Sequence, residues 1–159
     1  MTRKDSQKIL QRLIRIAAKE AKHLLYTTTR LTALSIDLAW IENLEDNEER
    51  SEWLDAFVSR YGRLQDTLGN KLLPALLTAN LEKTGSQLDN LLLAEKLGWI
   101  DSMEDWVDLR DLRNNLIHEY MESPQGLLEA LQAALKGAQV LVETQTRLTD
   151  HAQQQGFLA

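Results

Sequence analysis

Apolar residues recur at steps of three and four along most of the chain, which is the spacing of one face of an α-helix. The first such series runs over about residues 4–45 and comprises Ile9, Leu13, Ile16, Leu24, Leu31, Leu34, Leu38 and Ile41. We therefore expect one long helix over this stretch. Thr27, Thr28 and Thr29 stand together inside it and mark a candidate bend.

The remaining helices are predicted from the residues that begin and end them. These signals are, in chain order, Asp46 or Asn47, Pro74, Ser86, Gly98, Ser102 and Ser123-Pro124. Short polar side chains cap the amides at helix starts, glycine ends helices, and proline interrupts or begins them. The signals in this sequence predict a second helix that is kinked or restarted at the first proline, and a short third helix. They further predict a fourth helix to about Met121 and a last helix to about His151.

These elements predict an all-α protein, an antiparallel up-and-down bundle of four to five helices. The 159 residues are 43% hydrophobic with only seven glycines and two prolines, which suits one helical domain over residues 1–159 and argues against a turn-rich β-fold. The four tryptophans fall at helical or cap positions and are expected in its core. We expect the last few residues to fray.

The sequence predicts neither a membrane span nor a metal site. No apolar run reaches the roughly 20 residues that cross a bilayer, and the first residues lack the apolar stretch of a secretory signal, so a cytoplasmic protein is expected. There is no cysteine, and His23, His118 and His151 are far apart in the chain, without the spacing of metal ligands. We expect no cofactor, and we assign no role to the first and last of these histidines.

Charge is distributed unevenly along the chain. Residues 1–34 hold eight Lys or Arg against two acidic residues, a balance of +6. Because the net charge of the whole chain is −6, residues 35–159 carry −12. Six regularly spaced cations, here called the basic stripe, can share one face of the first helix: Lys4, Lys8, Arg12, Arg15, Lys19 and Lys22. The stripe is a candidate contact for RNA or for an acidic partner protein, and the alternative is an ordinary solvated face. No aromatic residue is seen interleaved with it for base stacking.

The most informative spacing lies on the fourth predicted helix, where Arg113 is followed by His118 and then by Tyr120. By the ideal helix period, Arg113 lies within about 20° of Tyr120, on or beside the apolar face. A guanidinium there loses hydration and needs an anion, which a bound phosphate would supply. His118 lies about 140° from Arg113, and Asn114 can hydrogen-bond either the imidazole or a ligand.

These side chains are sufficient for RNA cleavage by transesterification at a 2′-hydroxyl. The imidazole of His118 would act as general acid and base, Arg113 would hold a phosphoryl oxygen, and Asn114 would position them. No second histidine is near, so the complementary proton transfer falls to water or to the same helix of a symmetry mate, which favours a homodimer with a shared cleft. The structural alternative is that Arg113 pairs with Asp66 or Asp108 while His118 is only solvated.

The segment Arg113–Tyr120 resembles the Arg-x4-His-x-Tyr motif of HEPN-domain ribonuclease toxins, specifically the HepT group of type VII toxin–antitoxin pairs. Its second position, Asn114, is polar as the family prefers. The stretch Tyr61–Asp66 also resembles HepT-like sequences. The resemblance implies a HEPN-like helical bundle and a metal-independent endoribonuclease that works as a homodimer.

The resemblance also implies roles for individual residues. Arg113 and His118 would be catalytic. An MntA-like nucleotidyltransferase antitoxin would transfer AMP onto Tyr120, and the added phosphate and adenine would block the cleft as a substrate mimic. The family further contains non-catalytic substrate-binding partners of small nucleotidyltransferases, and such a partner is the alternative function.

Overall fold

The structure is a computed structural model that describes residues 2–158, and it is all-α as predicted. The α-helices are α1 (Arg3–Thr32), α2 (Leu38–Glu42), α3 (Glu48–Asp66), α4 (Leu73–Ala79), α5 (Gln87–Lys96), α6 (Met103–Glu122) and α7 (Pro124–Gln154). A short 3-10 helix, η1 (Asn43–Asp46), follows α2, and a π-helical segment, η2 (Thr67–Leu72), joins α3 to α4.

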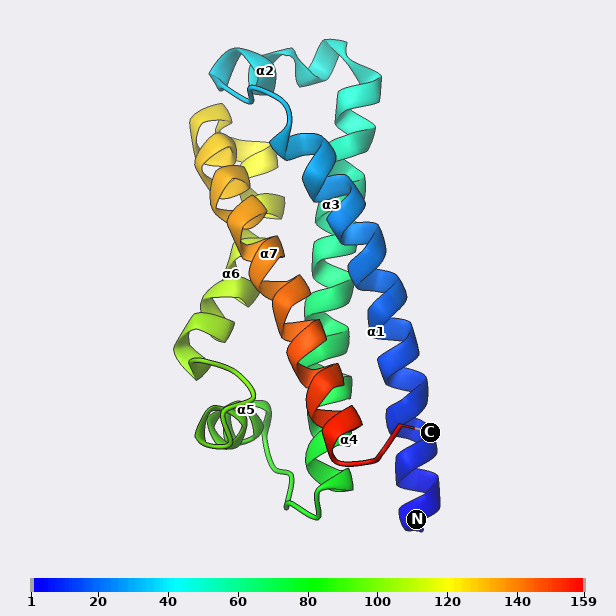
Figure 1. The fold of residues 1–159 in the computed structure, drawn as a ribbon. Helices are drawn as coiled ribbons and strands as arrows, with labels where there is room; N and C mark the ends of the chain where they lie inside the picture. The colour runs from blue at the N-terminus through cyan, green and yellow to red at the C-terminus, as the bar shows by residue number, and fades with distance from the viewer. Residues whose placement is uncertain (1, 159) are drawn as a thin grey trace.

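The four long helices, α1, α3, α6 and α7, form the body of the bundle (Figure 1). The chain rises along α1, returns along α3 and α4, rises again along α6 and returns along α7. Helix α2 with η1 closes one end, and α5 lies near the other end, before the start of α6. Helices α1 and α6 each pack against both α3 and α7, which places α1 and α6 diagonally across the bundle.

Leucine side chains dominate the core between these helices. The largest fully buried side chains are Tyr61, Phe57, Leu10, Leu24, Leu31, Leu54, Leu64, Leu68, Leu72, Leu73, Leu76 and Leu77. Each side chain of this size contributes roughly 1.5–3 kcal/mol when it leaves water. Trp40, Trp99 and Trp106 are buried as predicted, and Trp53 is half-buried under the guanidinium of Arg30, 4.1 Å from the ring centroid.

Capping residues begin the helices where the sequence predicts. The side chains that accept a hydrogen bond from a first-turn amide of α3, α5, α6 and α7 belong to Asn47, Ser86, Ser102 and Ser123. Of the two candidate caps of α3, Asn47 is therefore the one used. These starts are local features, so they can be predicted without knowledge of the packing.

The first helix is shorter than predicted, because it ends at Thr32 and not near residue 45. The carboxylate of Asp37 accepts a hydrogen bond from the amide of Trp40 at 2.9 Å and begins a separate helix, α2. The apolar spacing continues across the break since α2 also packs on the core. Thr27 and Thr28 do not interrupt α1, because their hydroxyls donate to the carbonyls four residues earlier.

The predicted interruption near Pro74 takes the form of the π-helix η2. The turns of η2 widen immediately before α4, and the proline stands in the first turn of α4, where its missing amide proton is tolerated. Gly69 of η2 lets α6 approach closely: a Cβ atom there would lie 2.8 Å from the indole nitrogen of Trp106. The chain stays helical from Glu48 to Ala79, so the second predicted helix is widened just before its proline and not restarted there.

Candidate functional site

Helix α6, which carries the Arg-x4-His-x-Tyr segment, is anchored to α3 by a buried tyrosine. The hydroxyl of Tyr61 donates a hydrogen bond to the carbonyl of Leu109 at 2.7 Å. In an α-helix this carbonyl also accepts from the amide four residues on, which is that of Arg113. The tyrosine therefore fixes the turn of α6 from which Arg113 projects.

The side chain of Arg113 crosses α3 at Gly62, the residue after this tyrosine. A Cβ atom at Gly62 would overlap Nε of Arg113 and would lie 2.9 Å from both its Cδ and its Cζ. Glycine leaves the room that the arginine occupies. In this arrangement Tyr61 holds the backbone of α6, and Gly62 receives the side chain of Arg113.

Arg113 is exposed, so the prediction of a dehydrated guanidinium is wrong. The residue lies about 60° from the buried Leu116 by the helix period, at the margin of the apolar face. Among the described residues no carboxylate lies within 4.0 Å of it, so the pairing with Asp66 or Asp108 does not form. Asp66 instead accepts a hydrogen bond from Nδ2 of Asn70 at 2.6 Å. The guanidinium is open to solvent and has no ion-pair partner among the described residues.

Tyr120 lies two turns beyond Arg113 on the same side of α6. Its hydroxyl is 3.2 Å from Oγ of Ser51 on α3, and the residue is 42% exposed. The ring borders a hollow of about 390 Å³ whose other lining residues are Leu54, Asp55, Val58, Ser59, Leu116, Ile117 and Leu127. We call this hollow the α3–α6 groove. Tyr120 borders it, whereas Arg113 is not among its lining residues and lies about one turn before Leu116 on α6.

A second hollow lies on the other side of the Tyr120 ring. It measures about 440 Å³, and its lining includes Glu42 and Glu45 from α2 and η1 and Glu122 from the end of α6. The phenol therefore stands between one mainly apolar hollow and one acidic hollow. Ser51 and this position of the ring were not foreseen, because nothing in the local sequence marks which residues of α3 face α6.

His118 and Asn114 lie on the outer face of α6. By the helix period each lies about 160° from the buried Leu116, one on either side of the direction that points away from the core. Both residues are exposed. Asn114 makes no hydrogen bond to Arg113 or to His118 within the described part of the chain, so it does not bridge them in one subunit. One chain thus presents Arg113 toward α3 and His118 toward solvent.

Comparison of the chain with protein-family models, with curated proteins and with solved structures gave no match. Across residues 2–158, no group of three or more His, Cys, Asp or Glu side chains is arranged to hold a metal ion. No helix of that same stretch combines the length and the apolar character that a bilayer crossing requires.

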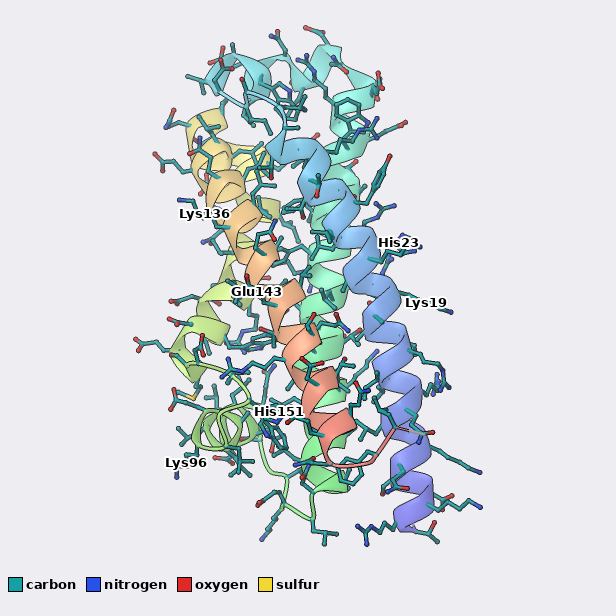
Figure 2. The ribbon with its side chains drawn as sticks, viewed as in Figure 1. Lys19, His23, Lys96, Lys136, Glu143 and His151 are labelled. Carbon is teal, nitrogen blue, oxygen red and sulfur yellow. The ribbon has the colours of Figure 1, made fainter. Side chains whose placement is uncertain are left out.

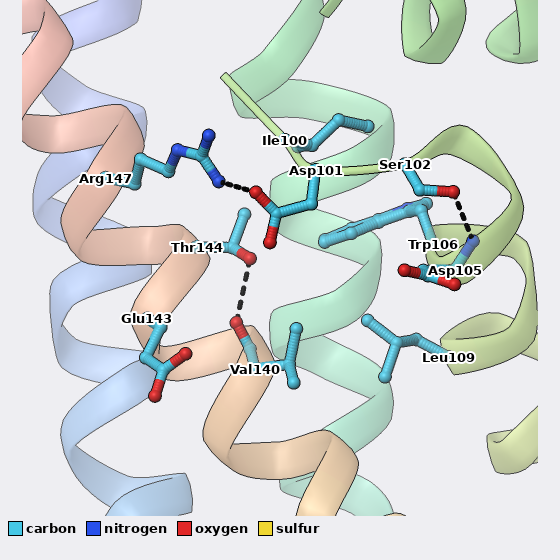
Figure 3. Close-up of a pocket in the computed structure, with 10 residues that line it drawn as sticks. All are labelled: Ile100, Asp101, Ser102, Asp105, Trp106, Leu109, Val140, Glu143, Thr144 and Arg147. Carbon is cyan, nitrogen blue, oxygen red and sulfur yellow. Dashed lines mark hydrogen bonds and ion pairs between the residues drawn. The ribbon is translucent and has the colours of Figure 1, made fainter. Parts of the chain in front are cut away.

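A further hollow, of about 180 Å³, lies between the start of α6 and α7 (Figure 3). Arg147 of α7 donates to the carboxylate of Asp101 at 2.7 Å and to the carbonyl of Gly98 at 2.6 Å. Ser102 caps α6 through the amide of Asp105. These bonds fasten the loop between α5 and α6 onto α7, so the polar groups at this hollow have a structural role.

Proposed function

We propose that this protein is a metal-independent endoribonuclease, the toxin of a type VII toxin–antitoxin pair, that cleaves RNA at a cleft shared by two identical chains. The observation that carries the proposal is the guanidinium of Arg113, which lies against Gly62, is exposed, and is not paired with any described carboxylate. An exposed cation without an ion-pair partner is suited to bind a phosphodiester.

The reaction follows from the chemistry of these two side chains. His118 would accept the proton of a ribose 2′-hydroxyl, and the 2′-oxygen would attack the adjacent phosphorus. The bond from phosphorus to the 5′-oxygen would break, and that oxygen would take a proton from water. Arg113 would stabilise the negative charge on the phosphoryl oxygens. The products are a 2′,3′-cyclic phosphate and a 5′-hydroxyl.

A second copy supplies the geometry that one chain lacks. Arg113 and His118 point about 140° apart on α6, so a phosphate on the arginine does not meet the histidine of the same helix. In a dimer with its two-fold axis beside α6, Arg113 of one copy can face His118 of the other, and symmetry creates two such sites. Ile117 is 52% exposed on this side of α6 and offers apolar surface for the contact.

Tyr120 is the proposed site of regulation by an MntA-like nucleotidyltransferase antitoxin. Its phenolic oxygen would attack the α-phosphorus of ATP, pyrophosphate would leave, and the phenolic proton would pass to solvent. The ring is partly exposed and stands between two hollows, which gives the added phosphate and adenine room at the end of the α3–α6 groove. An anion and a base placed there would compete with RNA for Arg113.

The test is a complementation experiment between two inactive variants. Wild-type protein, Arg113→Ala and His118→Ala are incubated in EDTA with end-labelled RNA, and the 3′ ends of the fragments are identified. Each variant should lose about 100-fold or more of the cleavage rate. Co-refolded Arg113→Ala and His118→Ala chains should regain about a quarter of wild-type activity, because half the dimers are mixed and each mixed dimer keeps one of two sites.

Asn115→Ala, on an exposed position of the same helix, is the matched control and should cleave normally. If the mixed chains stay inactive, arginine and histidine do not act across a dimer. If wild-type protein shown by intact mass to carry no AMP cuts no RNA, the ribonuclease proposal fails. The alternative of a non-catalytic partner of a nucleotidyltransferase then takes its place.

A further inference from the structure

The outer face of α1 is a line of exposed cations. All six residues of the basic stripe are exposed, and none forms an ion pair with another described residue. They recur about once per helical turn from Lys4 to Lys22, which at 1.5 Å per residue is a line of about 27 Å. The stripe predicted from the sequence is therefore a continuous surface and not a set of paired charges.

The two acidic residues of α1 do not neutralise this line. Asp5 belongs to the capping box, where its carboxylate accepts hydrogen bonds from the amide and hydroxyl of Thr2. Glu20 accepts a hydrogen bond from the hydroxyl of Thr67 in η2 at 2.7 Å. Neither carboxylate forms an ion pair with a cation of the stripe.

An aromatic ring extends the same face beyond the end of the basic stripe, although, as expected, none is interleaved with the cations themselves. Tyr26 follows Lys22 by one turn and is 64% exposed. By the helix period it lies within about 20° of both Arg15 and Lys19. Lys19 and His23 project from the outer edge of α1 (Figure 2). The ring therefore stands at the end of the cationic line with its faces open to solvent.

From these observations we propose that the outer face of α1 binds a single strand of nucleic acid, with its phosphates along the basic stripe and one base stacked on Tyr26. A protein of net charge −6 repels a polyanion elsewhere, so the stripe confines binding to this face. A tyrosine ring stacks on an unpaired base of any kind, which favours a single strand over a duplex. The same ring favours nucleic acid over an acidic protein, since carboxylates offer it no stacking partner.

This surface is separate from the α3–α6 groove. Helix α1 lies diagonally across the bundle from α6, and its outer face is turned away from the core. A strand on the stripe is thus held at a distance from Arg113. The proposed binding does not depend on RNA cleavage by residues of α6, so binding measurements alone test it.

The experiment measures binding of a fluorescein-labelled oligouridine of about twelve nucleotides by anisotropy, in a series of NaCl concentrations. His118→Ala protein is used throughout so that cleavage cannot interfere. The logarithm of the affinity should fall linearly with the logarithm of the salt concentration, with a slope of about −4 for six neutralised phosphates. Oligothymidine and a duplex of the same length show whether the sugar or the single strand is recognised.

Charge reversal at Arg12→Glu with Arg15→Glu should weaken binding at least tenfold and make the slope shallower by about 1.4. The matched control is Lys83→Glu with Lys96→Glu, which changes the net charge equally at two exposed positions outside α1 and should change affinity less than about twofold. Tyr26→Ala should weaken binding about fivefold or more and leave the slope unchanged. All these positions are exposed, and circular dichroism checks that each variant folds.

Equal weakening by the two charge-reversal pairs would overturn the proposal, because overall charge and not the stripe would then set the affinity. Duplex bound as tightly as single strand, or no effect of Tyr26→Ala, would overturn the stacked base. No binding at low salt would overturn the whole inference and leave an acidic protein as the occupant of the stripe. Binding without cleavage by wild-type protein would contradict only the ribonuclease proposal.

Discussion

The side chain of Arg113 occupies the space that a Cβ atom at position 62 would fill, and Gly62 is the residue that leaves it empty. The neighbouring Tyr61 holds the same turn of α6 through the carbonyl of Leu109. Two consecutive residues of α3 therefore determine where the guanidinium of α6 lies. A substitution at Gly62 can therefore move the guanidinium of Arg113 without changing any residue of α6.

Gly62→Ala should separate stability from activity. Alanine is favoured over glycine inside a helix by roughly 0.5–1 kcal/mol, and the exposed Arg113 can move aside, so the free energy of unfolding should be unchanged or higher. Cleavage should fall at least about tenfold, because the new methyl group displaces the phosphate-binding cation. Thermal unfolding and RNA cleavage are measured on the same preparation. Full activity in this variant would contradict the role given to Arg113.

Tyr61→Phe should cost stability through one lost hydrogen bond. The carbonyl of Leu109 keeps its helical partner, so the expected loss is about 1 kcal/mol, or roughly 2–4 °C in Tm for a chain of this size. Burial raises the pKa of Tyr61 well above its ordinary value. The folded protein should therefore show the same tyrosinate absorbance change with pH in wild type and variant until alkali unfolds it. A smaller change in the variant would show that Tyr61 ionises while folded.

Glu20 should make stability depend on pH in the mildly acidic range. Desolvation by burial raises the pKa of Glu20, and the hydrogen bond from Thr67 and the charge of Arg63 oppose this only in part. Between its ordinary pKa and the raised one, the folded state holds a proton that the unfolded state releases, so stability falls as pH rises through this window.

Glu20→Gln keeps an acceptor for Thr67 and removes this loss. The variant should be at least as stable as wild type at neutral pH and indistinguishable from it below the window. Urea unfolding from acidic to neutral pH measures the difference between the two proteins. A variant that is less stable at neutral pH would mean that the charge of Glu20 contributes more than its burial costs.

Leu81→Gly should stabilise the protein. Leu81 follows α4 with φ +62° and is 80% exposed, so a side chain with little packing occupies a left-handed conformation. Such a conformation costs about 1–2 kcal/mol for residues other than glycine. Glycine removes this strain but gains freedom in the unfolded chain, so we expect a net rise of up to about 1 kcal/mol and 2–4 °C in Tm. Glu82→Gly, at the next position, should not raise Tm.

The sequence by itself determined the helical class and most helix starts. Apolar spacing and capping side chains act within one or two turns, so Asn47, Ser86, Ser102 and Ser123 begin helices whatever packs around them. The same reasoning missed the end of α1, because apolar spacing continues into α2 across a break capped by Asp37. Periodicity reports which face is buried, and it does not report where the chain turns.

Only the tertiary structure decided what each face of a helix meets. The helix period placed Arg113 beside the apolar face, but the residue that it lies against is Gly62 of α3, which is 51 positions earlier in the printed sequence. Tyr26 follows the basic stripe by one turn and had no role in the sequence analysis, because whether its ring is buried depends on where α3 and α7 lie. An angle about a helix axis is a local quantity, whereas the neighbour found at that angle is set by the packing of all the long helices together.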